Sequence, residues 1–245
     1  MENDILLLFK RMFHDSSKMR YFLVFTLILG FFSDAFCQRH PKAIIISNPD
    51  DYVEGTFIRK APLKSMKAVY KSPSGFKYVE GLECFNSIPR IHWMLTCQDN
   101  AFYADDGHFM FFWFVADKLD SGQIALAEAI NPKLDYNVDK THISQIQGYI
   151  EAAFGEDAAL HWKSYVTYYS QAKARGMFNA DTLIALPVKL DSSEYYKGKY
   201  KYVMALFIQK NGRGFATFNC FYDDKGKENL DKYIKQLKEV IWFEE

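Results

Sequence analysis

The stretch HFMFFWFVA at residues 108–116 constrains the fold of this chain more than any other feature. Successive side chains of a β-strand point to opposite faces of a sheet, and this stretch is apolar at both alternating sets of positions. One face would carry Phe109, Phe111, Trp113 and Val115, and the other Met110, Phe112, Phe114 and Ala116. A strand that is apolar on both faces must be covered on both faces, so other elements must pack on each side of its sheet.

A second strand of the same kind predicts a β-hairpin near the C-terminus. The run YVMALFI at 202–208 is also apolar at both sets of positions, and it is followed by Asn211–Gly214. The chain then returns as FATFNCFY at 215–222. Asn-Gly readily adopts the positive φ angles of a tight turn, so these two runs are predicted to pair.

Two further turns are predicted upstream. Ser72–Gly75 separates a strand that ends at Tyr70 from one that runs through Val79. Asp105–Gly107 is the predicted turn before the 108–116 strand, with an earlier strand expected at 91–97.

Three stretches with helical spacing can cover the predicted sheet. The first carries Ile143, Ile146 and Ile150 and breaks at Gly155; the second carries Leu160, Tyr165, Tyr168 and Tyr169 and stops near Gly176; the third carries Leu230, Tyr233, Ile234 and Leu237 opposite Lys232, Lys235, Gln236 and Lys238. We therefore expect an α+β fold in one domain over 38–245. Its antiparallel sheet would be covered by helices on both faces as an α/β/α sandwich.

Residues 1–37 are expected to be an N-terminal extension plus a secretory signal peptide. Lys18 and Arg20 precede an uncharged run over 21–32, and Ala35–Cys37 has the small residues that a signal peptidase recognises. Cleavage would fall between Cys37 and Gln38, and the mature protein would be periplasmic or extracellular. A run of twelve residues is too short for a permanent membrane anchor, which needs about 20.

Two alternatives concern this N-terminal region. The apolar run could instead be a buried helix of a cytosolic domain, because signal sequences and core helices overlap in length. Met19 is either the true start of the protein or part of a long leading segment.

The C-terminal part of the chain resembles a known fold family. The hairpin YKYVMALFIQKNGRGFATFNCFYDD, the amphipathic helix after it and the closing VIWF look like the C-terminal half of Mog1/PsbP-like domains, and YKSPSGFKYVEG is similar to the opening turn of that fold. The chain is also similar to uncharacterised secreted bacterial proteins. The resemblance implies a non-enzymatic accessory or interaction module, and it places no partner-binding residue on this sequence.

Charge and cysteine content exclude some classes of function. The 30 Lys and Arg residues balance 30 Asp and Glu, and no basic run is dense enough to follow a nucleic-acid backbone. After cleavage Cys84, Cys97 and Cys220 remain. Two arrangements of these cysteines are possible. Either Cys84 and Cys97 form a disulfide and Cys220 is a free thiol, or all three are buried free thiols. No spacing of Cys and His indicates zinc, and no cofactor is expected.

Two groups of residues are candidates for chemistry. Asp105, Asp106 and His108 could ligate a divalent metal, although Asp-Asp-Gly is also typical of a hairpin turn. Trp93 and Trp162 could bind a ligand by stacking, although scattered aromatic residues usually pack in the core. No GxSxG nucleophile motif and no phosphate-binding glycine loop is present.

These observations favour an exported accessory protein that binds an unknown protein or small-molecule partner in the cell envelope and catalyses no reaction. The alternative is an enzyme of unrecognised type, metal-dependent near Asp105, Asp106 and His108. A third hypothesis is a structural subunit of an envelope assembly, which would differ from an accessory protein mainly in that its contacts are permanent.

The signal-peptide hypothesis predicts the N-terminus of the protein in its native cells. Mass spectrometry of the purified protein should find a chain that begins at Gln38, because signal peptidase would remove everything before it. A protein that still carries residues 19–37 would contradict export by this route.

Overall fold

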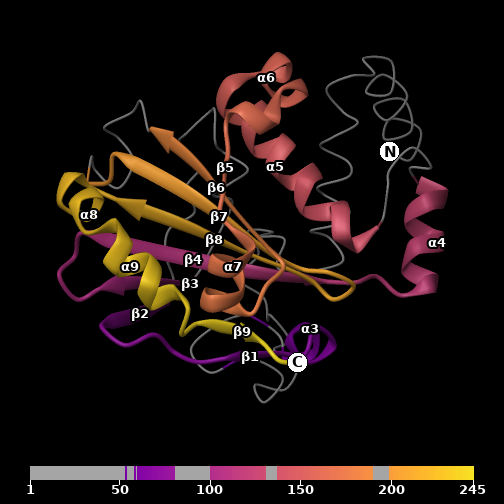
Figure 1. Ribbon diagram of the computed structural model, residues 1–245, viewed down its shortest axis with the longest axis horizontal. Coiled ribbons are helices and arrows are strands. Elements are labelled where there is room, and N and C mark those ends of the chain that lie inside the picture. The colour runs from indigo at the N-terminus through magenta and orange to yellow at the C-terminus, as the bar shows by residue number, and fades with distance from the viewer. Residues whose placement is uncertain (1–52, 54–57, 59, 81–99, 131–136, 190–198) are drawn as a thin grey trace, which may run out of the picture. The chain divides into compact units, whose positions relative to one another are not determined.

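The computed structural model describes residues 53, 58, 60–80, 100–130, 137–189 and 199–245 (Figure 1). The predicted signal sequence, its cleavage site at Cys37 and Gln38, and the candidates Cys84, Cys97 and Trp93 lie outside these residues. The contacts divide the chain into two compact units, and the described part of the smaller unit is 119–130. The expectation of one domain over 38–245 stays a prediction.

The smaller unit contains one described helix, α4 (Ser121–Ile130). Its start is fixed by a reciprocal cap, in which Asp120 N donates to Gln123 Oε1 at 2.9 Å and Gln123 N donates to Asp120 Oδ1 at 2.8 Å. This capping box satisfies backbone N–H groups that the first helical turn leaves unpaired.

The larger unit is a mixed α+β structure built on an antiparallel sheet. Its elements in chain order are α3 (Lys60–Ser65), β1 (Ala68–Tyr70), β2 (Phe76–Glu80), β3 (Asn100–Ala104), β4 (Phe109–Asp117), α5 (Val138–Phe154), α6 (Glu156–Leu160), the 3₁₀ turn η3 (Trp162–Ser164), β5 (Thr167–Tyr168), α7 (Gln171–Phe178), β6 (Thr182–Lys189), β7 (Tyr202–Lys210), β8 (Gly214–Tyr222), α8 (Asp224–Glu228), α9 (Leu230–Leu237) and β9 (Ile241–Phe243).

Seven strands form the main sheet in the order β2-β3-β4-β8-β7-β6-β5, and β1 pairs with β9 in a separate two-stranded sheet. The predicted hairpin is confirmed as β7 and β8, which pair from Tyr202↔Tyr222 to Lys210↔Gly214. Gly214 has a φ of 145°, and a Cβ there would lie 2.3 Å from the carbonyl oxygen of Ala116 on the neighbouring β4. Glycine is therefore required at this point of the sheet.

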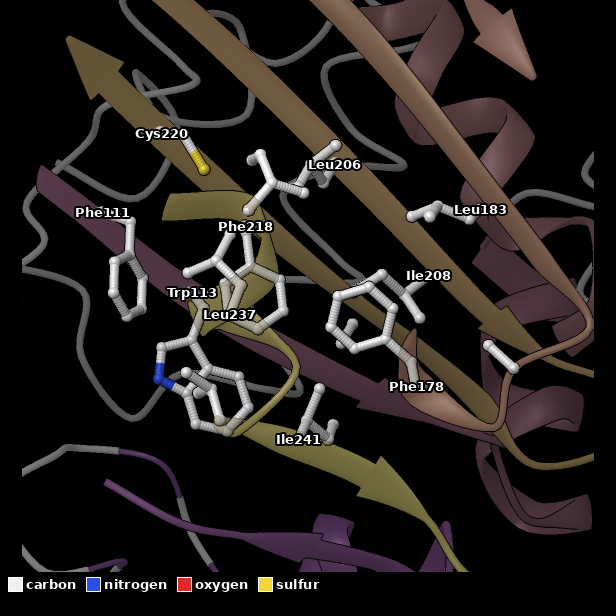
Figure 2. Packing of buried hydrophobic residues seen from close by; sticks show 14 of the residues in the cluster. Phe111, Trp113, Phe178, Leu183, Leu206, Ile208, Phe218, Cys220, Leu237 and Ile241 are labelled. Carbon is white, nitrogen blue, oxygen red and sulfur yellow. The ribbon is translucent and has the colours of Figure 1, made fainter. Parts of the chain in front are cut away.

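The predicted alternation along β4 is confirmed. Phe109, Phe111, Trp113 and Val115 belong to one buried apolar cluster, and Met110 and Phe112 belong to another. The first cluster also contains Phe178 of α7 and Leu237 of α9 (Figure 2). Helices α7 and α9 thus pack on one face of the sheet.

Helix α5 packs on the other face of the sheet. Ile146 and Ile150 of α5 belong to the same buried cluster as Met110 and Phe112 of β4. Ala158 of α6 is buried in this cluster too. Both faces of β4 are therefore covered, as its doubly apolar sequence requires.

Stacked aromatic rings connect the first cluster to the smaller sheet. The ring of Trp113 on β4 stacks on Phe218 of β8, with ring centroids 5.6 Å apart and ring planes 9° from parallel. It also stacks on Tyr70 of β1, with ring centroids 5.5 Å apart and ring planes 10° from parallel. Such pairs add about 0.5–1.5 kcal/mol each beyond their buried area. The stack fixes β1, and with it β9, against the main sheet.

The stretch predicted as a second helix near Gly176 differs in the structure. It divides into α6, η3, the short strand β5 and α7. Sheet pairing interrupts the helix, since Tyr169 N donates to the carbonyl oxygen of Leu183 on β6 and Ser170 then caps a new helix by accepting from Lys173 N. Helix α7 continues through Gly176 to Phe178.

Several buried polar side chains lie between α5 and the central strands. Thr217 Oγ1 of β8 donates to Gln145 Oε1 at 2.9 Å, and Asn219 Nδ2 donates to Tyr149 OH at 3.4 Å. His142, one turn before Gln145, is also buried. Burial lowers the pKa of His142 to about 4, against the opposing effect of Asp139.

The buried histidine predicts that the fold loses stability in mild acid. Above its ordinary pKa of 6.5, His142 is neutral whether the protein is folded or unfolded, so its contribution is fully present there. Between pH 6.5 and about 4 the unfolded chain takes up a proton that the folded protein does not, which costs about 3 kcal/mol by pH 4. Urea unfolding of the wild type and of His142→Gln across this range should show a flatter pH dependence in the variant, and parallel curves would contradict the assignment.

Candidate functional site

The β3–β4 turn contains the three residues predicted as metal ligands. Gly107 has a φ of 74°, and its N–H donates to the carbonyl oxygen of Ala104 at 2.8 Å, which closes the turn. The backbone N–H of His108 donates to Asp106 Oδ1 at 3.2 Å. Asp105 is exposed. The predicted turn over 105–107 is therefore confirmed.

Two side chains of this turn hold the C-terminal helices. Asp106 Oδ2 accepts a 2.6 Å hydrogen bond from Tyr233 OH of α9, with the ammonium of Lys232 at 3.8 Å. His108 Nδ1 lies 2.7 Å from Oδ2 of Asp223, the residue that caps α8. The turn is thereby linked to both α8 and α9.

A glycine allows α8 to approach the turn closely. Asp223 Oδ1 accepts from the N–H of Gly226 at 2.8 Å, and a Cβ on Gly226 would lie 2.2 Å from the carbonyl oxygen of His108. Any larger residue at this position would separate the helix from the turn. The His108–Asp223 pair and the cap of α8 therefore act together.

The electrostatics keep both aspartates of the cluster ionised. Partial burial acts to raise the pKa of Asp106, but hydrogen bonds from Tyr233 and from the His108 N–H, with the charge of Lys232, bring it below its ordinary value. Burial likewise opposes ionisation of Asp223, while the Gly226 N–H and His108 lower its pKa overall. Burial and the Asp106 carboxylate raise the pKa of Tyr233, which stays a neutral donor.

The polar side-chain atoms of Asp106 and His108 contact other residues of the protein. In the described ranges, no group of three or more His, Cys, Asp or Glu side chains is placed to hold a metal ion. A metal at Asp105, Asp106 and His108 would need ligands from elsewhere in the chain. A carboxylate beside Nδ1 of a histidine is an arrangement that general acid–base catalysis also uses.

Three large apolar side chains are exposed on α5, α6 and β5, which follow one another along the chain. Phe154, Leu160 and Tyr168 are 46%, 73% and 51% exposed. Two of these rings contact other aromatic rings. The ring centroids of Phe154 and Tyr165 are 4.9 Å apart, and those of Tyr168 and Trp162 are 6.2 Å apart. We call the exposed set Phe154, Leu160 and Tyr168, with Tyr165, the aromatic corner.

Trp162 lies in the core beneath the aromatic corner, with 9% of its surface exposed. The ring available for stacking is that of Tyr168. Helical spacing predicted Tyr168 within a helix, whereas it lies in the strand β5 and is exposed. An extended reading of YVTYYS would have separated Tyr168 from Tyr169, which point to opposite sides of the chain in β geometry.

No protein-family model matches this chain, and no curated protein or solved structure matches it. Within the part of the chain that the structure describes, no helix has the length and apolar character needed to cross a membrane.

The cap of α8 predicts how stability depends on Asp223. Asp223→Ala should lower the free energy of unfolding by about 1–2 kcal/mol, because it removes an N-cap together with the partner of His108. Asp223→Asn should lose less, since its side-chain oxygen can still accept from Gly226 N–H.

The check is urea unfolding at several pH values. The lowered pKa of Asp223 means that its charged form stabilises the fold above the ordinary carboxyl range, and that this contribution is lost as the pH falls through the lower folded value. Wild type and Asp223→Ala should therefore converge in acid. If Asp223→Ala and Asp223→Asn lower the free energy of unfolding equally at pH 7, the helix cap is not the main contribution of Asp223 to stability.

Proposed function

We propose that this protein is an exported accessory protein that works by binding a partner in the cell envelope and catalyses no reaction of its own. We further propose that its larger unit is an α/β/α sandwich of the Mog1/PsbP-like kind. Support for the fold comes from the predicted hairpin and from helices that pack on both faces of β4. Support for export comes from the signal-like sequence at 19–38.

The aromatic corner is the observation that carries the binding function. Large apolar side chains that are exposed to this extent cost free energy in water, and exposed apolar surface is typical of interaction sites. Leu160 is 73% exposed at the end of α6, and Phe154 of α5 and Tyr168 of β5 are also exposed. Tyrosine and phenylalanine provide contact area with few rotatable bonds, so they lose little entropy on binding.

A second candidate function rests on the His108–Asp223 pair. Its 2.7 Å contact between a carboxylate and an imidazole nitrogen is suited to general acid–base catalysis, with or without a metal near Asp105 and Asp106. We rank this function second because both aspartates of the cluster also hold α8 and α9 in place. An enzyme would lose turnover of its substrate in His108→Gln, whereas the aromatic corner would be unaffected.

Site-specific crosslinking in native cells tests the binding function. A photoreactive phenylalanine analogue that replaces Leu160 should form a covalent adduct with an envelope component, because a partner would cover this side chain. The matched control replaces Val79, a 38% exposed residue on β2. Crosslinking at 79 but not at 160, or an adduct at 160 that persists in Tyr168→Ser with Phe154→Ser, would contradict binding at the corner.

A further inference from the structure

A groove lies between α7 and α9, on the sheet face that the aromatic corner does not cover. It has a volume of about 220 Å³ and is lined by Lys173, Gly176, Met177, Asp231, Ile234 and Lys235. Its lining surface is apolar, with Ile234 buried and Met177 half-buried against the core. Both helices lie together in front of the sheet in Figure 1.

Gly176 has no structural reason to be glycine. It lies in the last turn of α7 without a positive φ, and among the described residues, apart from its chain neighbours and its own helix backbone, no atom lies within 4 Å of the place that a Cβ would take. Glycine inside a helix costs about 0.5–1 kcal/mol relative to alanine. At Gly214 and Gly226, by contrast, a Cβ would overlap the backbone of β4 or of the β3–β4 turn. What a side chain at Gly176 would change is the width of the groove.

The helices around the groove carry more basic than acidic residues, although the chain as a whole is neutral. The exposed charged residues of α7 and α9 are Lys173, Arg175, Asp231, Lys232 and Lys235, of which Lys232 lies 3.8 Å from the carboxylate of Asp106. Four of these five are basic. Lys173 and Lys235 line the groove itself, while Asp231 supplies a single opposing charge. The field at this surface therefore favours an acidic ligand.

The size of the groove selects the kind of ligand. Pockets for drug-sized molecules have about 300–1,000 Å³, so this groove is too small for one. It suits a single large apolar side chain, and the flexible thioether of Met177 can adapt to its shape. An apolar anchor with acidic neighbours describes a peptide segment better than a long acyl chain.

We propose that the groove between α7 and α9 binds an acidic segment of a partner protein by taking up one large apolar side chain, with Lys173 and Lys235 pairing with flanking carboxylates. Gly176 keeps the groove open for that side chain. This surface differs from the aromatic corner and lies on the opposite face of the sheet, so the two can be occupied at once.

The experiment measures fluorescence anisotropy of a labelled peptide in which glutamates flank one leucine, added to the purified protein. The peptide should bind, with an affinity that falls as salt is added, because exposed charges are screened. Gly176→Met should weaken binding about tenfold or more, since it fills the space of the leucine side chain. The thermal midpoint of this variant should be unchanged or higher, because methionine favours a helix over glycine.

Matched variants separate the groove from general effects. Ala172→Met adds the same side chain to an exposed position of α7 outside the groove, and it should bind as the wild type does. Lys173→Gln with Lys235→Gln should weaken binding, whereas Lys225→Gln on α8 should not. A peptide with serine in place of leucine should lose most of its affinity.

Three results would overturn the proposal. They are no binding of the peptide by the wild type, equal binding by Gly176→Met, and binding of phosphatidylglycerol vesicles in place of the peptide with the same dependence on Lys173 and Lys235. The outcome is independent of the crosslinking test at Leu160, because that test probes the other face of the sheet. Failure at one surface therefore leaves the other proposal standing.

Discussion

The burial of the three central strands on both faces is the constraint on which the rest of the structure depends. All nine residues of β8 are buried, and β4 and β7 are buried along almost their whole length. Such strands cannot face water on either side, so α7 and α9 must cover one face and α5 the other. The Tyr70–Trp113–Phe218 stack extends the first of these layers to the small β1–β9 sheet.

The two helical layers differ in how they meet the sheet, and the difference bears on function. Helix α5 crosses the central strands with buried polar pairs, such as Gln145 with Thr217, which position the helix by hydrogen bonds. Helices α7 and α9 pack by apolar contacts through Phe178 and Leu237 and leave a groove between them. We expect the polar layer to respond to pH through His142, and the groove in the apolar layer is the surface that we propose for a partner.

The β3–β4 turn has a structural role that uses the same residue types as a chemical site would. Asp-Asp-Gly-His forms a turn, and the same carboxylate and imidazole hold α9 and α8 through Tyr233 and Asp223. Sequence spacing identified the turn but not these partners, which lie more than a hundred residues away along the chain. Metal ligation, acid–base chemistry and simple attachment of helices all use these residue types.

The sequence by itself determined the local features that depend on neighbouring residues. Alternation predicted both faces of β4, Asn211-Gly212 predicted the β7–β8 hairpin, and the spacing of Leu230, Ile234 and Leu237 predicted α9. Tertiary structure decided where long-range pairing competes with local preference. The pairing of Tyr169 with β6 interrupts a helical pattern, and β6 itself, which contains Pro187, was not among the predicted strands. Three further features depend on which distant elements pack nearby: the exposure of Tyr168, the burial of Trp162 and the open space at Gly176. A local sequence pattern cannot predict them, because it carries no information about those elements.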